Sequence, residues 1–502
     1  MYRALLSTSG FTLISRVTGF IRDLIMASVL APGALSDAFF VAFRLPNHFR
    51  TIFAEGAYNA AFVPMYSGLQ GSDAARAESF SRVMLGWQVA IQLVLLAVAF
   101  VAMPWIVLAL APGFADDPAQ VELASALTRI TFGYLLCVTV VTHLGGVLNA
   151  RNSFWAAAAA PVLLNICMGL ALLSVVFFPT AAHAAAWGVL GGGVAELLLL
   201  LFAARRAGAS ILPAMPRLTE DVRTFFARFI PATVGAAGVQ LAMFADTIFA
   251  SFLSAGSYTS LYYADRINQL PMGVIAIALG TVLLPQVSRS VTKGDAPATH
   301  RAFNRSTEVG LLLTLPCTAA FLVIPDVIMT GLFARGAFNI DAAHAAAAVL
   351  LAYAVGLPAF VMLRTVTPLF HARGDTRTPV VATGVSIGVN LALKGLFVMV
   401  IGMGVEGLAL ATALGTWVNL LVLGGYGVRR GFFDFSGGLP EQAGRMTLAA
   451  VYAGIVVLYL APGVDAALPA GMMLRAEAYM VLMGLAGLAT YGVGLLAAGW
   501  RR

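Results

Sequence analysis

The first long apolar segment of the chain reads FTLISRVTGFIRDLIMASVL, residues 11–30, and it decides the fold. About 20 apolar residues are enough for a helix to cross the hydrocarbon core of a bilayer. This segment nevertheless carries Arg16 and Arg22, and an arginine at the centre of a membrane helix costs about 2.5–3.5 kcal/mol. Membrane proteins keep such side chains where they face water, an opposite charge or a ligand. The segment therefore predicts a transmembrane helix with functional charges.

The composition of the whole chain agrees with this interpretation. The 502 residues are 60% hydrophobic and 11% charged, with a mean hydropathy of +0.89, whereas soluble domains carry about 25% charged residues. The net charge of +7 is typical of basic residues in cytoplasmic loops, so we expect no nucleic-acid partner. We predict an all-α polytopic membrane protein.

Apolar runs of membrane length recur along the chain and predict about 14 transmembrane helices. The N-terminal run is expected to be a retained first helix, because no small-residue cleavage site follows it. Basic residues gather in alternate connections, while the connection at 111–122, APGFADDPAQVE, is purely acidic. By the positive-inside rule, both ends of the chain should be cytoplasmic.

The sequence also contains an internal repeat. Three pairs of segments match in order: DLIMASVL (23–30) with DTIFASFL (246–253), AFRLP (42–46) with ADRINQLP (264–271), and NARN (149–152) with HARGD (371–375). Repeats of this kind are typical of transporters that bind substrate between two lobes and rock one lobe against the other.

The repeat predicts two parallel six-helix lobes. Residues 1–206 should form the N-lobe (helices 1–6), and residues 229–430 the C-lobe (helices 7–12). The connection 207–228 is either a plain linker or contains a short amphipathic helix on the inner leaflet. Residues 440–502 should form helices 13 and 14, outside the duplication.

Motifs for catalysis are missing. The two lysines lie in TKGDA and LKGLF, so the G-x-x-x-x-G-K-[ST] phosphate loop is not present. Cys137, Cys167 and Cys317 are far apart within apolar runs, which fits neither a disulfide framework nor a metal site. We expect a protein that is not an enzyme and has no cofactor or metal.

Charged and amide side chains concentrate in three predicted helices. They are Arg16, Arg22 and Asp23 in helix 1, Asp37, Arg44, Asn47, Arg50 and Glu55 in helix 2, and Asp265 and Arg266 in helix 8. Arginines outnumber acids, which favours an anionic ligand, because a guanidinium binds phosphate oxygens bidentately. The alternative for individual residues is an inter-helix clamp or a side chain that snorkels near a helix end.

A second polar set is expected within the C-lobe. It comprises Asp246 in helix 7 with Asn390 and Lys394 in helix 11. We favour a buried Asp246–Lys394 ion pair, because an ammonium can neutralise the carboxylate directly. A proton or sodium site that couples transport to an ion gradient is the alternative.

Several of these segments resemble one known family. They are SRVTGFIRDLIMASVLAPGALSDAFFVAFRLPNHFRTIFAEGAYNAAFVP (15–64), APGF (111–114), IFASFL (248–253), YYADRINQLP (262–271) and ALGTVLLPQ (278–286). The chain resembles the MurJ (MviN) lipid II flippase family of the multidrug/oligosaccharidyl-lipid/polysaccharide exporter superfamily. The resemblance extends through helix 12, and helices 13 and 14 match mainly by count.

The resemblance implies a central cationic cavity and a set of functional positions. These positions are Arg16, Arg22, Asp37, Arg50 and Arg266. Thr51 and Gln269 depart from the pattern of some relatives, which carry an arginine and an acid there. By resemblance, helices 13 and 14 help to form a hydrophobic groove for a polyprenyl tail.

The resemblance further implies a flippase that moves undecaprenyl-diphosphate-linked peptidoglycan precursor, lipid II, from the inner to the outer leaflet of the bacterial cytoplasmic membrane. We expect alternating access by a monomer, driven by membrane potential or an ion gradient, with lipid II, membrane lipids and a coupling ion as partners. The alternatives are a flippase for another anionic lipid-linked glycan and a cation-coupled drug exporter. The arginine excess argues against the exporter, whose cavity should be dominated by acids.

Overall fold

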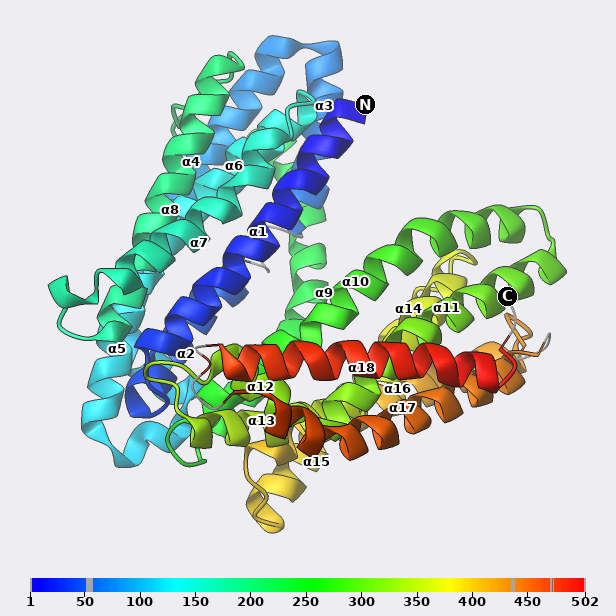
Figure 1. Cartoon of the computed structure of the whole chain (residues 1–502). Helices are drawn as coiled ribbons and strands as arrows, with labels where there is room; N and C mark the ends of the chain where they lie inside the picture. The colour runs from blue at the N-terminus through cyan, green and yellow to red at the C-terminus, as the bar shows by residue number, and fades with distance from the viewer. Residues whose placement is uncertain (1, 51–56, 435–437, 470–471, 473, 501–502) are drawn as a thin grey trace. The chain divides into compact units, whose positions relative to one another are not determined.

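The protein is almost entirely helical, as the computed structural model shows (Figure 1). The structure describes residues 2–50, 57–434, 438–469, 472 and 474–500. Apart from an isolated β-bridge between Arg335 and Phe338, these residues contain no strand. The prediction of an all-α protein is confirmed. Glu55 lies outside the described residues.

The first of two compact units consists of residues 1–256 and 335–338. Its elements are α1 (Tyr2–Val29), α2 (Ala34–Phe49), α3 (Ala57–Ser72), α4 (Ala74–Leu110), η2 (Pro112–Asp116), α5 (Pro118–Phe132), α6 (Tyr134–Ala150), α7 (Trp155–Leu173), η3 (Val175–Phe177), α8 (Ala181–Arg206) and α9 (Glu220–Ala250).

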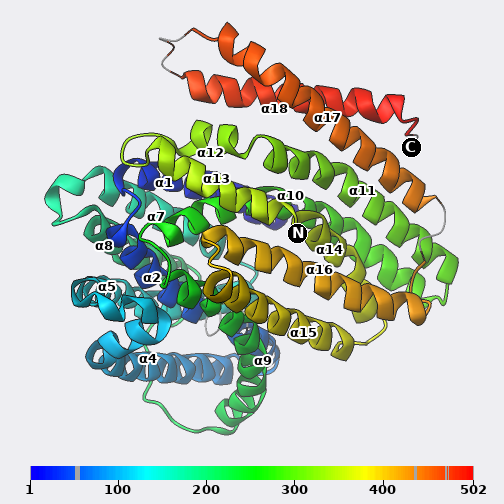
Figure 2. The ribbon, with the colours of Figure 1, turned by 90° about the horizontal axis from the view of Figure 1, so that it is seen from below.

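The second unit consists of residues 257–334 and 339–502. Its elements are α10 (Ser257–Thr292), α11 (Ala296–Val323), α12 (Pro325–Phe333), α13 (Ile340–Ala354), α14 (Leu357–His371), α15 (Arg377–Lys394), the π-helix η4 (Gly395–Val400), α16 (Val405–Arg429), α17 (Leu439–Ala467) and α18 (Arg475–Ala497). Helices α17 and α18 lie side by side in both views (Figures 1 and 2).

Many of these helices are long and apolar enough to cross a membrane. Among the described residues, nine meet both conditions, and α13 with α14, bent by 40°, would make a tenth if they form one span. The most apolar stretch of α4 has a mean hydropathy of 2.8, yet only 17% of it is buried inside the protein. An apolar surface of this kind requires lipid. The fold is that of a multi-pass membrane protein, and the count of 14 helices stays a prediction.

Small residues line the most extensive helix contact in the first unit, between α7 and α8. A Cβ atom added at Gly188 would lie 2.8 Å from the Met168 Cα, and one added at Gly192 would lie 2.9 Å from the Leu164 Cα. Helices in lipid associate by such close packing, since no hydrophobic effect drives them together there.

Connections that the topology places on one side of the membrane meet at one end of the first unit. The Arg151 guanidinium, after α6, donates to Glu78 in α4 at 2.9 Å and to the Ala207 carbonyl after α8 at 2.8 Å. Arg76 at the start of α4 makes a bidentate pair with Asp221 in α9, at 2.8 and 2.9 Å. The connections expected to be cytoplasmic are therefore neighbours.

The opposite end gathers the connections expected on the other side. The Gly113 amide donates to the Ser251 hydroxyl at 3.0 Å, and the Ala337 amide donates to the Ser28 carbonyl at 2.8 Å. The acidic connection begins α5 here, because the Asp117 carboxylate caps the helix by accepting from two backbone amides.

The connection after α8 has no regular helix over residues 207–219. It runs along α4: the Ala214 amide donates to the Arg82 carbonyl at 2.9 Å, and the Trp87 indole donates to the Arg217 carbonyl at 3.1 Å. Gly86 permits this contact, since a Cβ there would lie 1.9 Å from the Ala214 oxygen. The separate surface helix considered for this connection is not observed; residues 220–228 form the first turns of α9.

Helix α9, which the repeat assigns to the C-lobe, belongs to the first compact unit. It packs against α3 and α4, and Phe225 contributes to a buried aromatic cluster with Tyr58. Packing and sequence repetition thus divide the chain at different places. The repeat-based lobe boundary at 207–228 stays a prediction.

Candidate functional site

Arg22 is the most deeply buried cation of the predicted set. Its side chain is 5% exposed, and its guanidinium contacts the Asp23 carboxylate at 2.6 Å. It also donates to the Asn165 Oδ1 of α7 at 2.9 Å. Asn165 in turn donates to the Ser15 carbonyl at 3.1 Å, and Gly19 leaves room for this approach, since a Cβ there would be 3.3 Å from the Asn165 amide nitrogen. This network fastens α1 to α7.

Arg16 lies on the same helix, fewer than two turns earlier, in a different environment. It is exposed, and no hydrogen bond or ion pair joins its side chain to the described part of the chain. The sequence predicts that α1 crosses the membrane, where an uncompensated guanidinium requires water or an anion. Of Arg16 and Arg22, Arg16 is therefore the one that is available to a ligand.

Helix α2 carries two ionic contacts that involve distant parts of the first unit. Asp37 is 5% exposed and accepts from the Gly256 amide at 2.7 Å. Its place in the first turn of α2 also favours a negative charge. Further along α2, Arg44 lies 3.7 Å from the Asp246 carboxylate of α9.

Arg50 and Asn47 contact each other at the C-terminal end of α2. The Arg50 guanidinium donates to the Asn47 Oδ1 at 2.9 Å, and both side chains are half-buried. The structure thus places Asp37, Arg44 and Asn47 on one short helix, α2, with Arg50 directly after it.

Asp265 and Arg266 lie on α10 of the second unit. The Arg266 guanidinium is 5.3 Å from the centre of the Tyr262 ring and contacts the Tyr262 hydroxyl at 3.2 Å. Gln269 donates to the Asp265 carboxylate. Both charges are half-buried, and local neighbours orient them.

The second predicted set is divided between the units. Asp246 belongs to the first unit, where Arg44 lies within ion-pair distance. Asn390 and Lys394 lie on α15 of the second unit; Asn390 donates to Thr412 at 3.2 Å, and Lys394 is 2% exposed. The Asp246–Lys394 pair and the ion-coupling site stay predictions.

Sequence reasoning missed two partners in the site. One is Asn165, the acceptor for Arg22 on another helix. The other is Tyr262, whose i, i+4 spacing to Arg266 was a usable signal. The described residues contain no group of three or more His, Cys, Asp or Glu side chains that could hold a metal ion.

The fold defines a class, polytopic helical membrane proteins, and this chain carries buried charged side chains on α1 and α2. The family model described as "Lipid II flippase MurJ" matches residues 26–475. The chain therefore belongs to the MurJ lipid II flippase family. It is accordingly a multi-pass protein of the bacterial inner membrane.

Curated relatives and a solved structure agree with this assignment. A probable lipid II flippase MurJ of Rhizobium meliloti (strain 1021) is 39% identical over 88% of this chain and 84% of the relative. One from Rhizobium tropici is 36% identical over 92% of this chain and 87% of the relative. A lipid II flippase MurJ solved in an inward closed conformation matches 97% of both chains with a TM-score of 0.81 and 23% identity, which shows a shared fold.

Proposed function

We propose that this protein moves lipid II from the inner to the outer leaflet of the cytoplasmic membrane. The observation that carries the proposal is the exposed, uncompensated Arg16 on α1 of a chain that belongs to the lipid II flippase family. Lipid II presents a diphosphate, and guanidinium groups bind phosphate oxygens through paired hydrogen bonds.

The charged residues take different parts in the proposed site. Arg16, Arg50 and Arg266 contact the diphosphate. Arg22 already has Asp23 and Asn165 as partners, so it holds α1 in place and reaches the ligand only by exchanging one of them. Asp37 orients the start of α2 through the Gly256 amide.

The remaining charges hold helices and do not select the ligand. Arg44 and Asp246 join α2 to α9. Asp265 is held by Gln269, and Asn47 by Arg50. These contacts limit the freedom of the neighbouring side chains of the proposed site, which lowers the entropy cost of ligand binding.

The lobes alternate access to the site without ATP. An inside-negative potential favours outward movement of an anion by about 2.3 kcal/mol per charge per 100 mV. Two net charges give roughly 4–5 kcal/mol per 100 mV, enough to bias a transport cycle. A coupling ion adds to or replaces this term.

The orientation of the protein in the membrane follows from the positions of its basic residues. The ends of the units that carry Arg76, Arg151, Arg373 and Arg430 face the cytoplasm by the positive-inside rule, and both termini lie on that side. The protein works as a monomer, without an enzymatic step.

A binding measurement on the full-length protein in detergent tests the substrate. Lipid II should bind the unmodified chain, and Arg16→Ala should weaken binding by about tenfold, the effect of losing roughly 1.4 kcal/mol. The control Arg206→Ala removes an exposed arginine at the end of α8 and should leave affinity unchanged. Equal affinity for an undecaprenyl-diphosphate glycan without the peptide would instead support a flippase for other anionic lipid-linked glycans.

A further inference from the structure

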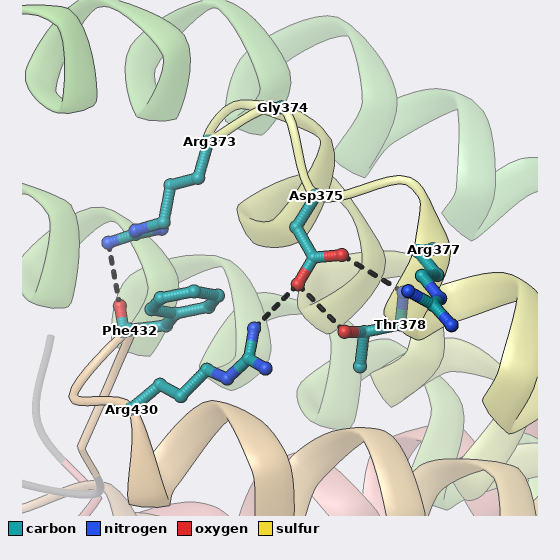
Figure 3. A pocket seen from close by; sticks show the side chains of 7 residues that line it. All are labelled: Arg373, Gly374, Asp375, Arg377, Thr378, Arg430 and Phe432. Atoms are coloured by element: carbon teal, nitrogen blue, oxygen red, sulfur yellow. Dashed lines mark hydrogen bonds and ion pairs between the residues drawn. The ribbon is translucent and has the colours of Figure 1, made fainter.

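A cavity with an unassigned function lies in the second unit, between the α14–α15 connection and the end of α16 (Figure 3). Its volume is about 510 Å³. The residues that line it are Arg373, Gly374, Asp375, Arg377, Thr378, Arg430 and Phe432. None of these residues belongs to the proposed flippase site.

The single carboxylate of this cavity, that of Asp375, accepts three hydrogen bonds. Asp375 accepts from the Thr378 amide at 2.9 Å, from the Thr378 hydroxyl at 2.7 Å and from Arg430 at 2.9 Å (Figure 3). The hydrogen bonds from Thr378, with a smaller contribution from the Arg430 charge, hold the pKa of Asp375 below its usual range. The carboxylate therefore stays ionised at neutral pH and neutralises one arginine.

Arg373 is fixed in orientation but not neutralised. Its guanidinium donates to the Leu369 carbonyl at 2.9 Å and to the Phe432 carbonyl at 3.1 Å. It also lies 4.4 Å from the centre of the Phe432 ring. Carbonyls and a ring hold this side chain in place while its positive charge remains available.

Arg377 adds a third guanidinium. It is exposed at the start of α15, and no hydrogen bond or ion pair of its side chain occurs within the residues that the structure describes. The cavity thus has three guanidinium groups and one carboxylate, a surplus of two positive charges.

In the corresponding corner of the first unit, two arginines are paired with acids. There, Arg151, which the internal repeat pairs with Arg373, contacts Glu78 at 2.9 Å. Its neighbour Arg76 is paired with Asp221. An arginine that is needed only to set the membrane topology requires neither a cavity nor a fixed side chain. The corner of the second unit has a cavity and side chains that are held in place.

We propose that this cavity, which we call the arginine corner, binds a phosphate-bearing anion separate from the transported lipid. Planar guanidinium groups held in place match the geometry of phosphate oxygens. The phosphate comes either from the headgroup of an anionic phospholipid or from a small phosphate ester in solution, since the corner lies where the helices of a membrane unit end.

The test measures binding to the purified, delipidated full-length protein by native mass spectrometry. The probes are short-chain phosphatidylglycerol, phosphatidylcholine and glycerol 3-phosphate. Arg377→Gln should weaken binding of the anionic probe by about fivefold, the effect of one arginine near a phosphate surface. Arg377 has no partner among the described residues, so this substitution leaves the native contacts of the corner intact.

The matched control is Arg429→Gln, which removes the exposed arginine adjacent to Arg430 outside the cavity. It should change affinity by less than about twofold. If phosphatidylglycerol alone depends on Arg377, the ligand is a lipid headgroup; if glycerol 3-phosphate shows the same dependence, the ligand is a soluble phosphate ester. Equal losses for the two variants, or none for either, would overturn the proposal.

Discussion

Arg16 and Arg22 show how two identical residues on one helix can have different roles. Arg22 is 4% exposed and has a carboxylate and an amide as partners. Arg16 is exposed and has no partner among the described residues. A buried ion pair contributes to stability mainly by avoiding an uncompensated charge, whereas an exposed arginine is free to bind a ligand. Replacing Arg22 should therefore lower the stability of the protein, whereas replacing Arg16 should weaken ligand binding.

Replacement of Arg22 should unfold the protein at a lower temperature. Arg22→Ala leaves the Asp23 carboxylate buried without its cation, which costs about 3–5 kcal/mol in a buried pair. Arg16→Ala should leave the melting temperature unchanged, because it breaks no contact of the described chain. Thermal unfolding in detergent, followed by tryptophan fluorescence, measures both variants; an equal drop for the two would contradict the assigned roles.

Asn165 provides a neutral test of the same network. Asn165→Ala removes an acceptor from Arg22 and a donor from the Ser15 carbonyl. Hydrogen bonds to charged groups contribute about 1.5–3 kcal/mol, so the melting temperature should fall by less than in Arg22→Ala. A melting temperature equal to that of the unmodified protein would show that α1 is held by other contacts.

At the scale of elements, glycines decide how closely neighbouring segments pack. Gly192 in α8 faces Leu164 of α7, with only 2.7 Å between an added Cβ and the Leu164 Cδ1. Gly191, its neighbour in sequence, has nothing within 4 Å of an added Cβ. Alanine substitutions at Gly191 and Gly192 therefore separate the effect of helix packing from the effect of helix propensity.

Gly192→Ala should destabilise the protein, while Gly191→Ala should not. Overpacking of a close helix contact costs about 1–3 kcal/mol, whereas alanine at an open helical position is neutral or stabilising by up to about 1 kcal/mol. The measurement is the melting temperature of each variant. A lower melting temperature for Gly191→Ala than for Gly192→Ala would contradict the α7–α8 contact.

Gly86 plays a similar part for the 207–219 connection. An added Cβ would collide with the Ala214 oxygen, so Gly86→Ala should release the connection from α4. Trypsin should then cut after Arg217 faster than in the unmodified protein. Gly68→Ala in α3 is the control, since an added Cβ there meets nothing within 4 Å; equal cutting in both variants would exclude this role for Gly86.

At the scale of the whole molecule, the connections expected on one side of the membrane lie together at one end of each unit. In the first unit, Arg151 and Glu78 mark one end, and Gly113 and Ser251 mark the other. In the second unit, the Arg430–Asp375 pair brings together connections that are likewise expected to be cytoplasmic. Alternation of the chain between two ends is what repeated membrane crossings require.

The topology can be measured directly by cysteine labelling. In a variant without the three native cysteines, Ser72→Cys should react with a membrane-impermeant maleimide only after the inner face is exposed. Asp116→Cys, in the acidic connection, should react in intact spheroplasts. The reversed pattern would overturn the orientation derived from the basic residues.

The fold class and the charged positions could be predicted from the sequence, but most contacts could not. Hydropathy shows membrane helices, and arginines in apolar runs stand out by their cost. The hydrogen bond from Arg22 to Asn165 joins residues far apart in the chain, so it depends on helix packing that no local pattern contains. For the same reason Asp246 was expected beside Lys394, while Arg44 is the ion-pair partner that the first unit provides.

The central claim is that the chain moves lipid II through a site that needs Arg16. The most direct measurement is the amount of lipid II exposed on the outer leaflet of cells whose own flippase has been depleted and replaced by this chain. The unmodified protein and Arg206→Ala should restore exposure, and Arg16→Ala, verified to be inserted in the membrane, should reduce it by about tenfold. Full exposure with Arg16→Ala would contradict the proposed site, and no exposure with the unmodified protein would contradict the proposed function.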